Sequence, residues 1–176
     1  NGDQWDPMDY GREFDFNRPF FDQWAELSKE VPRLPLMQVA NENSPYTTGT
    51  GYCKNSHLIN SSEYCEDCYY GNPYRCKQCV DSFLLRDSEL CLECVDSSKL
   101  YSCYKCQNCS NSSDLKFCFE VNNSKDCFCC AALNHKQYCI YNKQYSREDY
   151  EKILEEIDLY DSVQLGDVIK KFQELK

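Results

Sequence analysis

Cysteine recurs at multiples of three residues through the middle of this 176-residue chain. From Cys79 to Leu133, every third position carries Cys, Ser, Leu or Val, and the charged residues occupy the two positions between. An α-helix repeats every 3.6 residues and a strand every 2.0, so neither produces this pattern. A coil that turns a corner every three residues does produce it, with one inward side chain on each side.

The inward residues repeat again at a spacing of twelve, which gives four inward side chains per coil. One predicted column consists of Cys53, Cys65, Cys79, Cys91, Cys103, Leu115, Cys127 and Cys139. The next consists of Ser56, Cys68, Ser82, Cys94, Cys106, Cys118, Cys130 and Asn142. The phase changes between Cys68 and Cys79, so we expect two extra residues at the turn Gly71-Asn72-Pro73.

We call this pattern of inward residues, spaced by three and by twelve, the lattice. It predicts a mainly β fold, a narrow β-solenoid with about 12 residues per coil and about seven to eight coils. Coils stack at the spacing of neighbouring strands, about 4.8 Å, and four inward residues per coil leave a thin interior. Small or slim side chains are then required, and Cys, Ser and Leu supply them. We expect three regions: an N-terminal arm over 1–40, the solenoid over 41–145, and a helical cap over 146–176.

Both flanks of the lattice contain amphipathic patterns that predict short α-helices. The first covers residues 18–31, with Asn17 near its cap and Pro32 after its end. The C-terminal region opens with Ser146 as N-cap and Asp149 three residues later, a variant of the capping box. Because terminal coils of a solenoid expose core and strand edges, we expect these helices to pack on its two ends.

The thiols admit three interpretations. We favour reduced packing columns, because Ser or Leu replaces individual members of the CxxC pairs, which a closed metal site would not tolerate. If zinc is bound, its ligands are Cys91, Cys94, Cys103 and Cys106; otherwise no cofactor is expected. If a disulfide forms, the best pair is Cys103 with Cys109. Cys129 lies off the lattice, so we expect it to be an exposed, reactive thiol.

Outward positions supply two further candidate surfaces. Aromatic and aliphatic side chains form two adjacent outward columns, and their aromatic members make a candidate binding face: Tyr69, Phe83, Tyr104, Phe119 and Phe128. Carboxylates form a possible cation-binding face, with three in one column and a fourth nearby: Asp67, Asp81, Glu93 and Asp96. Neither surface needs a binding role: the terminal helices could cover the aromatic face, and the acidic face could simply be solvated.

Charge and motif content narrow the classes of function. The net charge of −10 disfavours nucleic-acid binding, which needs clustered Lys and Arg. No apolar run is long enough to span a membrane, and no secretion signal is present, so we expect a cytoplasmic chain. The sequence opens with "NGDQWDPMDY", without an initiator Met, so we expect an N-terminally trimmed fragment. No nucleophile elbow, phosphate-binding glycine loop or metalloprotease motif occurs, so we expect no enzyme.

The lattice resembles the beetle-type β-helical antifreeze proteins, which also place Cys and Ser inward in twelve-residue coils. Their Thr-x-Thr ice-binding ladder is missing here, so ice binding is not implied. Three blocks are similar to an uncharacterised Cys-rich bacterial family of the candidate phyla: "WDPMDYGREFDFNRPFFDQW", "NENSPYT" and "YCIYNKQYSREDYE". Members of that family carry a basic, zinc-ribbon-like segment upstream, and the resemblance implies no activity.

These observations predict a non-catalytic binding or scaffold module that presents a regular face to a protein partner or to a second copy of itself. One alternative is a zinc protein that acts on nucleic acid together with an upstream zinc-ribbon segment. Another is a carbohydrate-binding or carbohydrate-active solenoid, for which the face containing Asp81 is the support.

Overall fold

The computed structural model describes residues 6–33 and 36–175, and the chain divides into two compact units between Met37 and Gln38. The first unit contains a short 3-10 helix, Pro7–Tyr10, and helix α1, Phe20–Glu30. α1 falls inside the predicted span 18–31, but Pro19 is its N-cap and no described residue of α1 is buried. Asn17 caps nothing: its main-chain N–H donates to Asp15. Residues 1–5 and 34–35 of the predicted arm lie outside the described residues.

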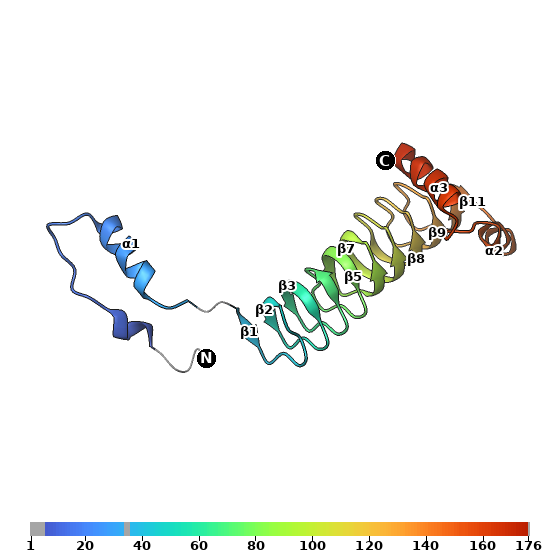
Figure 1. The fold of residues 1–176 in the computed structure, drawn as a ribbon. Helices are drawn as coiled ribbons and strands as arrows, with labels where there is room; N and C mark the ends of the chain where they lie inside the picture. Colours follow the sequence, from blue (N-terminus) through green and yellow to red (C-terminus); the bar gives the residue numbers. More distant parts are fainter. Residues whose placement is uncertain (1–5, 34–35, 176) are drawn as a thin grey trace. The chain divides into compact units, whose positions relative to one another are not determined.

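The second unit is a narrow parallel β-solenoid of about nine turns, slightly more than the sequence predicted. Figure 1 shows its coils following one another from β1 to β9. Each strand pairs with the next in parallel at an offset near twelve, as in Cys91 with Cys103; only β10 and β11 are antiparallel. The strands are β1 Gln38–Val39, β2 Thr48–Gly51, β3 His57–Glu63, β4 Tyr69–Gly71, β5 Val80–Arg86, β6 Glu89–Leu92, β7 Val95–Tyr104, β8 Ser110–Lys116, β9 Lys125–Phe128, β10 Gln137–Ile140 and β11 Lys143–Gln144.

The corners of the coil explain the three-residue period. Between Ala40 and Asn142, nearly every third residue has a φ near +50°, the left-handed region. Such a residue redirects the chain, and the two residues between corners are extended. None of the residues described with positive φ is Val, Ile or Thr, because a branched Cβ clashes in that region. Asn and Asp, which tolerate it best, occupy many of these corners, among them Asn108, Asn111 and Asn123.

The interior is a set of stacked Cys, Ser and Leu side chains, as the lattice predicted. Seven inward serines each bridge two coils. Ser112, for example, donates its hydroxyl to the carbonyl oxygen of Ser110 (2.8 Å) and accepts the main-chain N–H of Ser124 in the next coil (3.1 Å). Inward cysteines donate in the same way to the carbonyl two residues earlier, as Cys91 does to Glu89 (3.4 Å). Small polar side chains therefore satisfy the main chain where no room remains for water.

The predicted register before Gly71 is wrong. The coil that contains Gly71-Asn72-Pro73 has one residue fewer than twelve, not two extra, because Glu66 pairs with Lys77 and Tyr69 with Val80. Pro73 is buried, and inward positions 71 and 73 are only two residues apart. The columns therefore change membership at this coil: Cys53 and Cys65 stack on Cys76 rather than on Cys79. The twelve-residue register after Pro73 is as predicted.

The C-terminal helices pack on one side of the last coils (Figure 1). α2 spans Arg147–Glu155 and α3 spans Ser162–Leu175. Ser146 caps α2 as predicted, since its Oγ accepts the main-chain N–H of Asp149 at 3.1 Å. The apolar faces of these helices bury Tyr150, Val168 and Phe172 against outward aromatic side chains of the solenoid.

Candidate functional site

The four candidate zinc ligands lie together in the interior. Cys91 and Cys103 stack in one inward column and Cys94 and Cys106 in the next, and the thiol of Cys106 lies against the carbonyl oxygens of Tyr104 (3.5 Å) and Leu115 (3.5 Å). Burial raises the pKa of Cys106 well above its ordinary value, so this thiol stays protonated. Among the described residues, no group of three or more His, Cys, Asp or Glu side chains is arranged to hold a metal ion.

The proposed disulfide between Cys103 and Cys109 is not formed. All fifteen cysteines of the chain are free and buried. Cys103 and Cys109 occupy different sides of one coil, with the inward Cys106 between them, and both thiols contact carbonyl oxygens, of Tyr101 (3.4 Å) and Gln107 (3.3 Å). An intervening thiol fills the space that a disulfide would need.

The prediction that Cys129 is exposed is wrong. It is an outward corner residue with a φ of 49°, but its exposed fraction is 0%. The C-terminal helices cover it, and it lies in a cluster with Phe117, Phe128 and Phe172. Burial raises the pKa of its thiol to about 12, so it is a poor nucleophile at neutral pH. The lattice gives the direction of a side chain, but it does not say what covers it.

The predicted aromatic face divides into a covered part and an exposed part. One outward column runs through His57, Tyr69, Val80, Leu92, Tyr104, Lys116, Phe128 and Ile140. In the last coils α2 and α3 bury Phe128 and pack against Tyr104 and Phe119. Tyr69 and Phe83, in earlier coils, are 37% and 55% exposed. Tyr69 belongs to this column, and not to that of Phe83 as predicted, because of the short coil.

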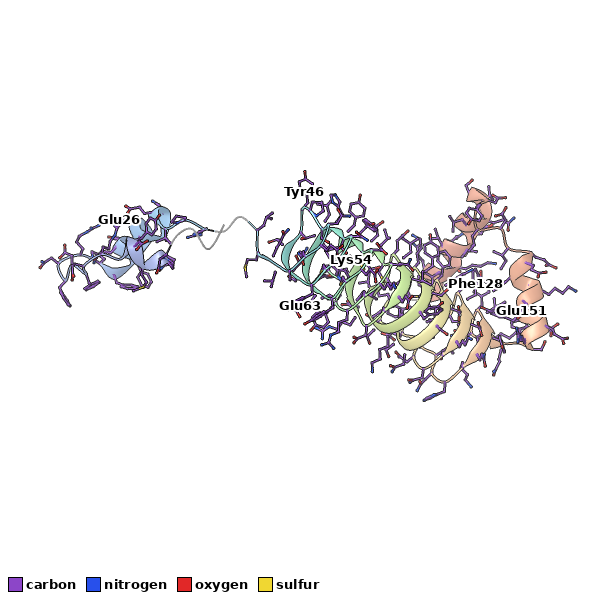
Figure 2. All side chains as sticks on the ribbon, turned by 90° about the horizontal axis from the view of Figure 1, so that it is seen from below. Glu26, Tyr46, Lys54, Glu63, Phe128 and Glu151 are labelled. Carbon is purple, nitrogen blue, oxygen red and sulfur yellow. The ribbon has the colours of Figure 1, made fainter. Side chains whose placement is uncertain are left out.

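The exposed part continues toward the first coils. We call it the apolar strip; its side chains are 37–71% exposed. Figure 2 shows Tyr46 on the side of the first coils that α3 occupies beside the last ones, near Phe128. Where the strip meets α3, there is a groove of about 260 Å³. Val95 and Phe117 of the solenoid and Ile169 and Phe172 of α3 line it, together with the ion-paired Glu93 and Lys105. The strip consists of Tyr46, Leu58, Tyr69, Tyr70, Phe83, Leu84 and Leu92.

The predicted carboxylate face is not brought together. Asp81 and Glu93 occupy the same corner of successive coils, but the short coil moves Asp67 to a different corner. Asp96 lies at yet another corner, one side further along its coil. Glu93 also forms an ion pair with Lys105. Asp81 and Glu93 lie within the apolar strip, at the corner between the column of Leu92 and the column of Phe83, and Asp96 follows Leu84 at the next corner.

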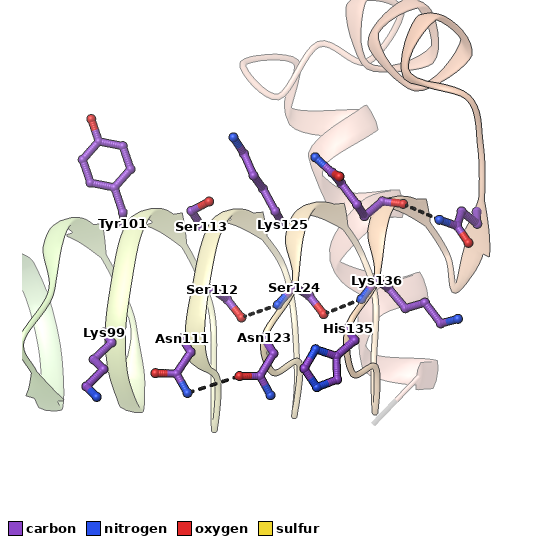
Figure 3. Close-up of a pocket in the computed structure, with 12 residues that line it drawn as sticks. Lys99, Tyr101, Asn111, Ser112, Ser113, Asn123, Ser124, Lys125, His135 and Lys136 are labelled. Atoms are coloured by element: carbon purple, nitrogen blue, oxygen red, sulfur yellow. Dashed lines mark hydrogen bonds between the residues drawn. The ribbon is translucent and has the colours of Figure 1, made fainter.

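A polar depression on another side of the last coils was missed in the sequence. Its volume is about 750 Å³, and it is open to solvent. Figure 3 shows one row of its side chains, Lys99, Asn111, Asn123 and His135, along a single corner of successive coils. Lys125 and Lys136 line it as well. The twelve-residue register could have revealed this row, since its members are spaced by twelve.

Comparisons with known proteins identify no relative. No model of a known protein family matches the chain, and no curated protein is significantly similar to it. Among the helices that the structure describes, none has the length and apolar character needed to cross a membrane. The fold and its surfaces are therefore what the chain offers for assigning a function.

Proposed function

We propose that this chain is a protein-binding module whose apolar strip receives an amphipathic helix of a partner protein. The observation that supports it most is that one face carries apolar side chains both where a helix covers it and where it is exposed. In the last coils the chain's own α3 covers this face with Val168 and Phe172, whereas the same columns remain exposed in the first coils. A face that seats one amphipathic helix presents the same periodic contacts to a second.

The size and charge of the apolar strip are suited to an amphipathic helix of a partner protein. Monomeric proteins seldom expose a continuous apolar patch that runs over several layers of structure. The strip extends over about five coils, or about 20 Å, the length of about thirteen helical residues. Asp81 and Glu93 lie between its columns and Asp96 follows Leu84, in a chain of net charge −10, so the partner helix carries Lys or Arg among its apolar contacts.

A peptide copying residues 162–175 tests the proposal, because it carries the stripe that already seats on this face. We expect fluorescence anisotropy to show weak binding, with a dissociation constant of about 10–100 μM. Exchanging two exposed strip residues, Phe83→Ser with Leu92→Ser, should weaken binding about tenfold through lost apolar contact. A matched pair of exposed tyrosines at another corner, Tyr52→Ser with Tyr64→Ser, should leave it unchanged.

Two results would contradict the proposal. Absence of peptide binding up to millimolar concentration would do so, and so would equal binding by the strip variant, which would locate the peptide at the seat of α3 instead. A second copy of the chain could also occupy the strip, and sedimentation velocity of the chain alone tests this possibility. If the chain dimerises and the Phe83→Ser, Leu92→Ser variant does not, the strip binds a second copy rather than a partner.

A further inference from the structure

The polar depression has a regular construction that the apolar strip lacks. Two rows of outward side chains flank an inward column, so the backbone and the inward Ser112 and Ser124 lie between them. Lys99 and His135 end the first row, three coils apart, which is about 14 Å along the solenoid axis. Tyr101 and Lys125 belong to the second row (Figure 3). The depression is therefore long and shallow and suits an extended ligand that lies along the axis.

Its charge is opposite to that of the molecule. The chain has 29 acidic and 19 basic residues, yet none of the twelve described lining residues is acidic. Lys99 and Lys136 form no ion pair with another described residue, and Lys125 has only a distant one, 3.9 Å from Asp114. Lys136 follows Ser124 in an inward column, but the stack ends there and its side chain is exposed. Cations that lack internal partners are available to anionic groups of a ligand.

Two amides of the first row, those of Asn111 and Asn123, are hydrogen-bonded in series with Asn134 of the neighbouring column. Asn111 Nδ2 donates to Asn123 Oδ1 (3.3 Å), and Asn123 Nδ2 donates to Asn134 Oδ1 (2.9 Å). These bonds hold the amide planes in order and leave the remaining N–H and lone pairs directed to solvent. Gln137 and Gln144 add further amides, and Tyr101 adds a half-exposed ring. Ordered amides beside an aromatic ring match the hydroxyl groups and apolar ring faces of a sugar.

We propose that this depression binds an acidic oligosaccharide, a chain of sugars that bear carboxylates. The ordered amides bond the hydroxyl groups, Tyr101 packs against a ring face, and Lys99, Lys125 and Lys136 bind carboxylates. A single-stranded nucleic acid is disfavoured, because such binding relies on several stacking aromatic side chains and a basic groove. Tyr101 is the one aromatic side chain, apart from His135, among the described lining residues.

Isothermal titration calorimetry with oligogalacturonate as the probe tests this site. We expect millimolar to micromolar binding that weakens as salt is raised, because exposed charges are screened. Lys99→Gln with Lys136→Gln should weaken binding at least about tenfold. Asn123→Gly, which keeps the left-handed corner free of strain, should weaken it through loss of the amide. The control Lys54→Gln, an exposed lysine of the first coils paired with Glu42, should change nothing.

Three results would contradict the proposal that the depression binds an acidic oligosaccharide. These are absence of oligogalacturonate binding, equal binding by the double lysine variant, and equal affinity for a neutral cello-oligosaccharide. Tighter binding of a single-stranded oligonucleotide of the same charge would replace the sugar with nucleic acid. Circular dichroism of each variant verifies that the coils are intact. The Phe83→Ser, Leu92→Ser variant retains this depression, so failure here and failure of the protein-binding proposal are distinguished.

Discussion

At the scale of the residue, this fold depends on what each position in a three-residue unit must do. The inward residue has to be slim and has to satisfy main-chain groups. The corner residue has to accept a left-handed backbone. Serine meets the first demand with two hydrogen bonds, one within its coil and one to the next. The sequence shows both demands directly, which is why the period of three predicts the interior so well.

The bridging serines give the first test. Ser112→Ala removes the acceptor of the Ser124 N–H and the hydroxyl bond to Ser110, in a buried position. We expect the free energy of unfolding to fall by about 1–3 kcal/mol, measured by urea titration, because a buried N–H loses its partner. The adjacent outward change, Ser113→Ala, should alter it by less than about 0.5 kcal/mol. Equal effects of the two changes would show that the bridge contributes nothing.

At the scale of the element, the sequence alone did not predict the short coil or which side chains the C-terminal helices cover. The change of phase near Gly71 was visible, but phase alone does not distinguish a deletion of one residue from an insertion of two. The structure shows a deletion of one residue, because Pro73 points inward two residues after Gly71 instead of the usual three. Cys129 shows a similar limit for the packing of the C-terminal helices. Its outward direction follows from the lattice, whereas its burial depends on where α3 packs.

Glycine 71 is the residue on which the short coil depends. Its φ is +144°, and an added Cβ would lie 2.0 Å from the carbonyl oxygen of Ser82. We expect Gly71→Ala to lower the urea midpoint severely, by more than about 2 kcal/mol of unfolding free energy, since the backbone itself must move. Gly166→Ala in α3 meets nothing within 4 Å and should stabilise by about 0.5–1 kcal/mol. A harmless Gly71→Ala would mean that the coil adopts another register.

At the scale of the whole molecule, the solenoid is a linear stack in which each coil contacts its neighbours. The sequence predicted this architecture, the four inward columns after Pro73 and the cap at Ser146. It did not predict the polar depression, which arises where separate coils contribute side chains to one side. One consequence is that coils are units of length, so the stack should accept the loss of a whole coil.

Deleting residues 89–100 tests this property. The deletion joins Ser88 to Tyr101 and preserves the order of inward and outward positions, so we expect circular dichroism and cooperative urea unfolding to persist, with a smaller slope because less surface is buried. Deleting residues 89–99 joins Ser88 to Leu100, two inward residues that are 4% and 2% exposed. That eleven-residue deletion should abolish the cooperative transition. Comparable behaviour of both chains would contradict the stacked-unit description.

The left-handed corners also determine how such a chain can reach its native state. An L-residue held there costs about 1–2 kcal/mol, and one coil has four corners but no neighbour to form a ladder with. A lone coil is therefore a costly nucleus, and each later coil is a growth step that gains hydrogen bonds on an existing edge. The coils beneath α2 and α3 gain added apolar contacts at the outset. We expect nucleation at that end, with growth proceeding toward Gln38.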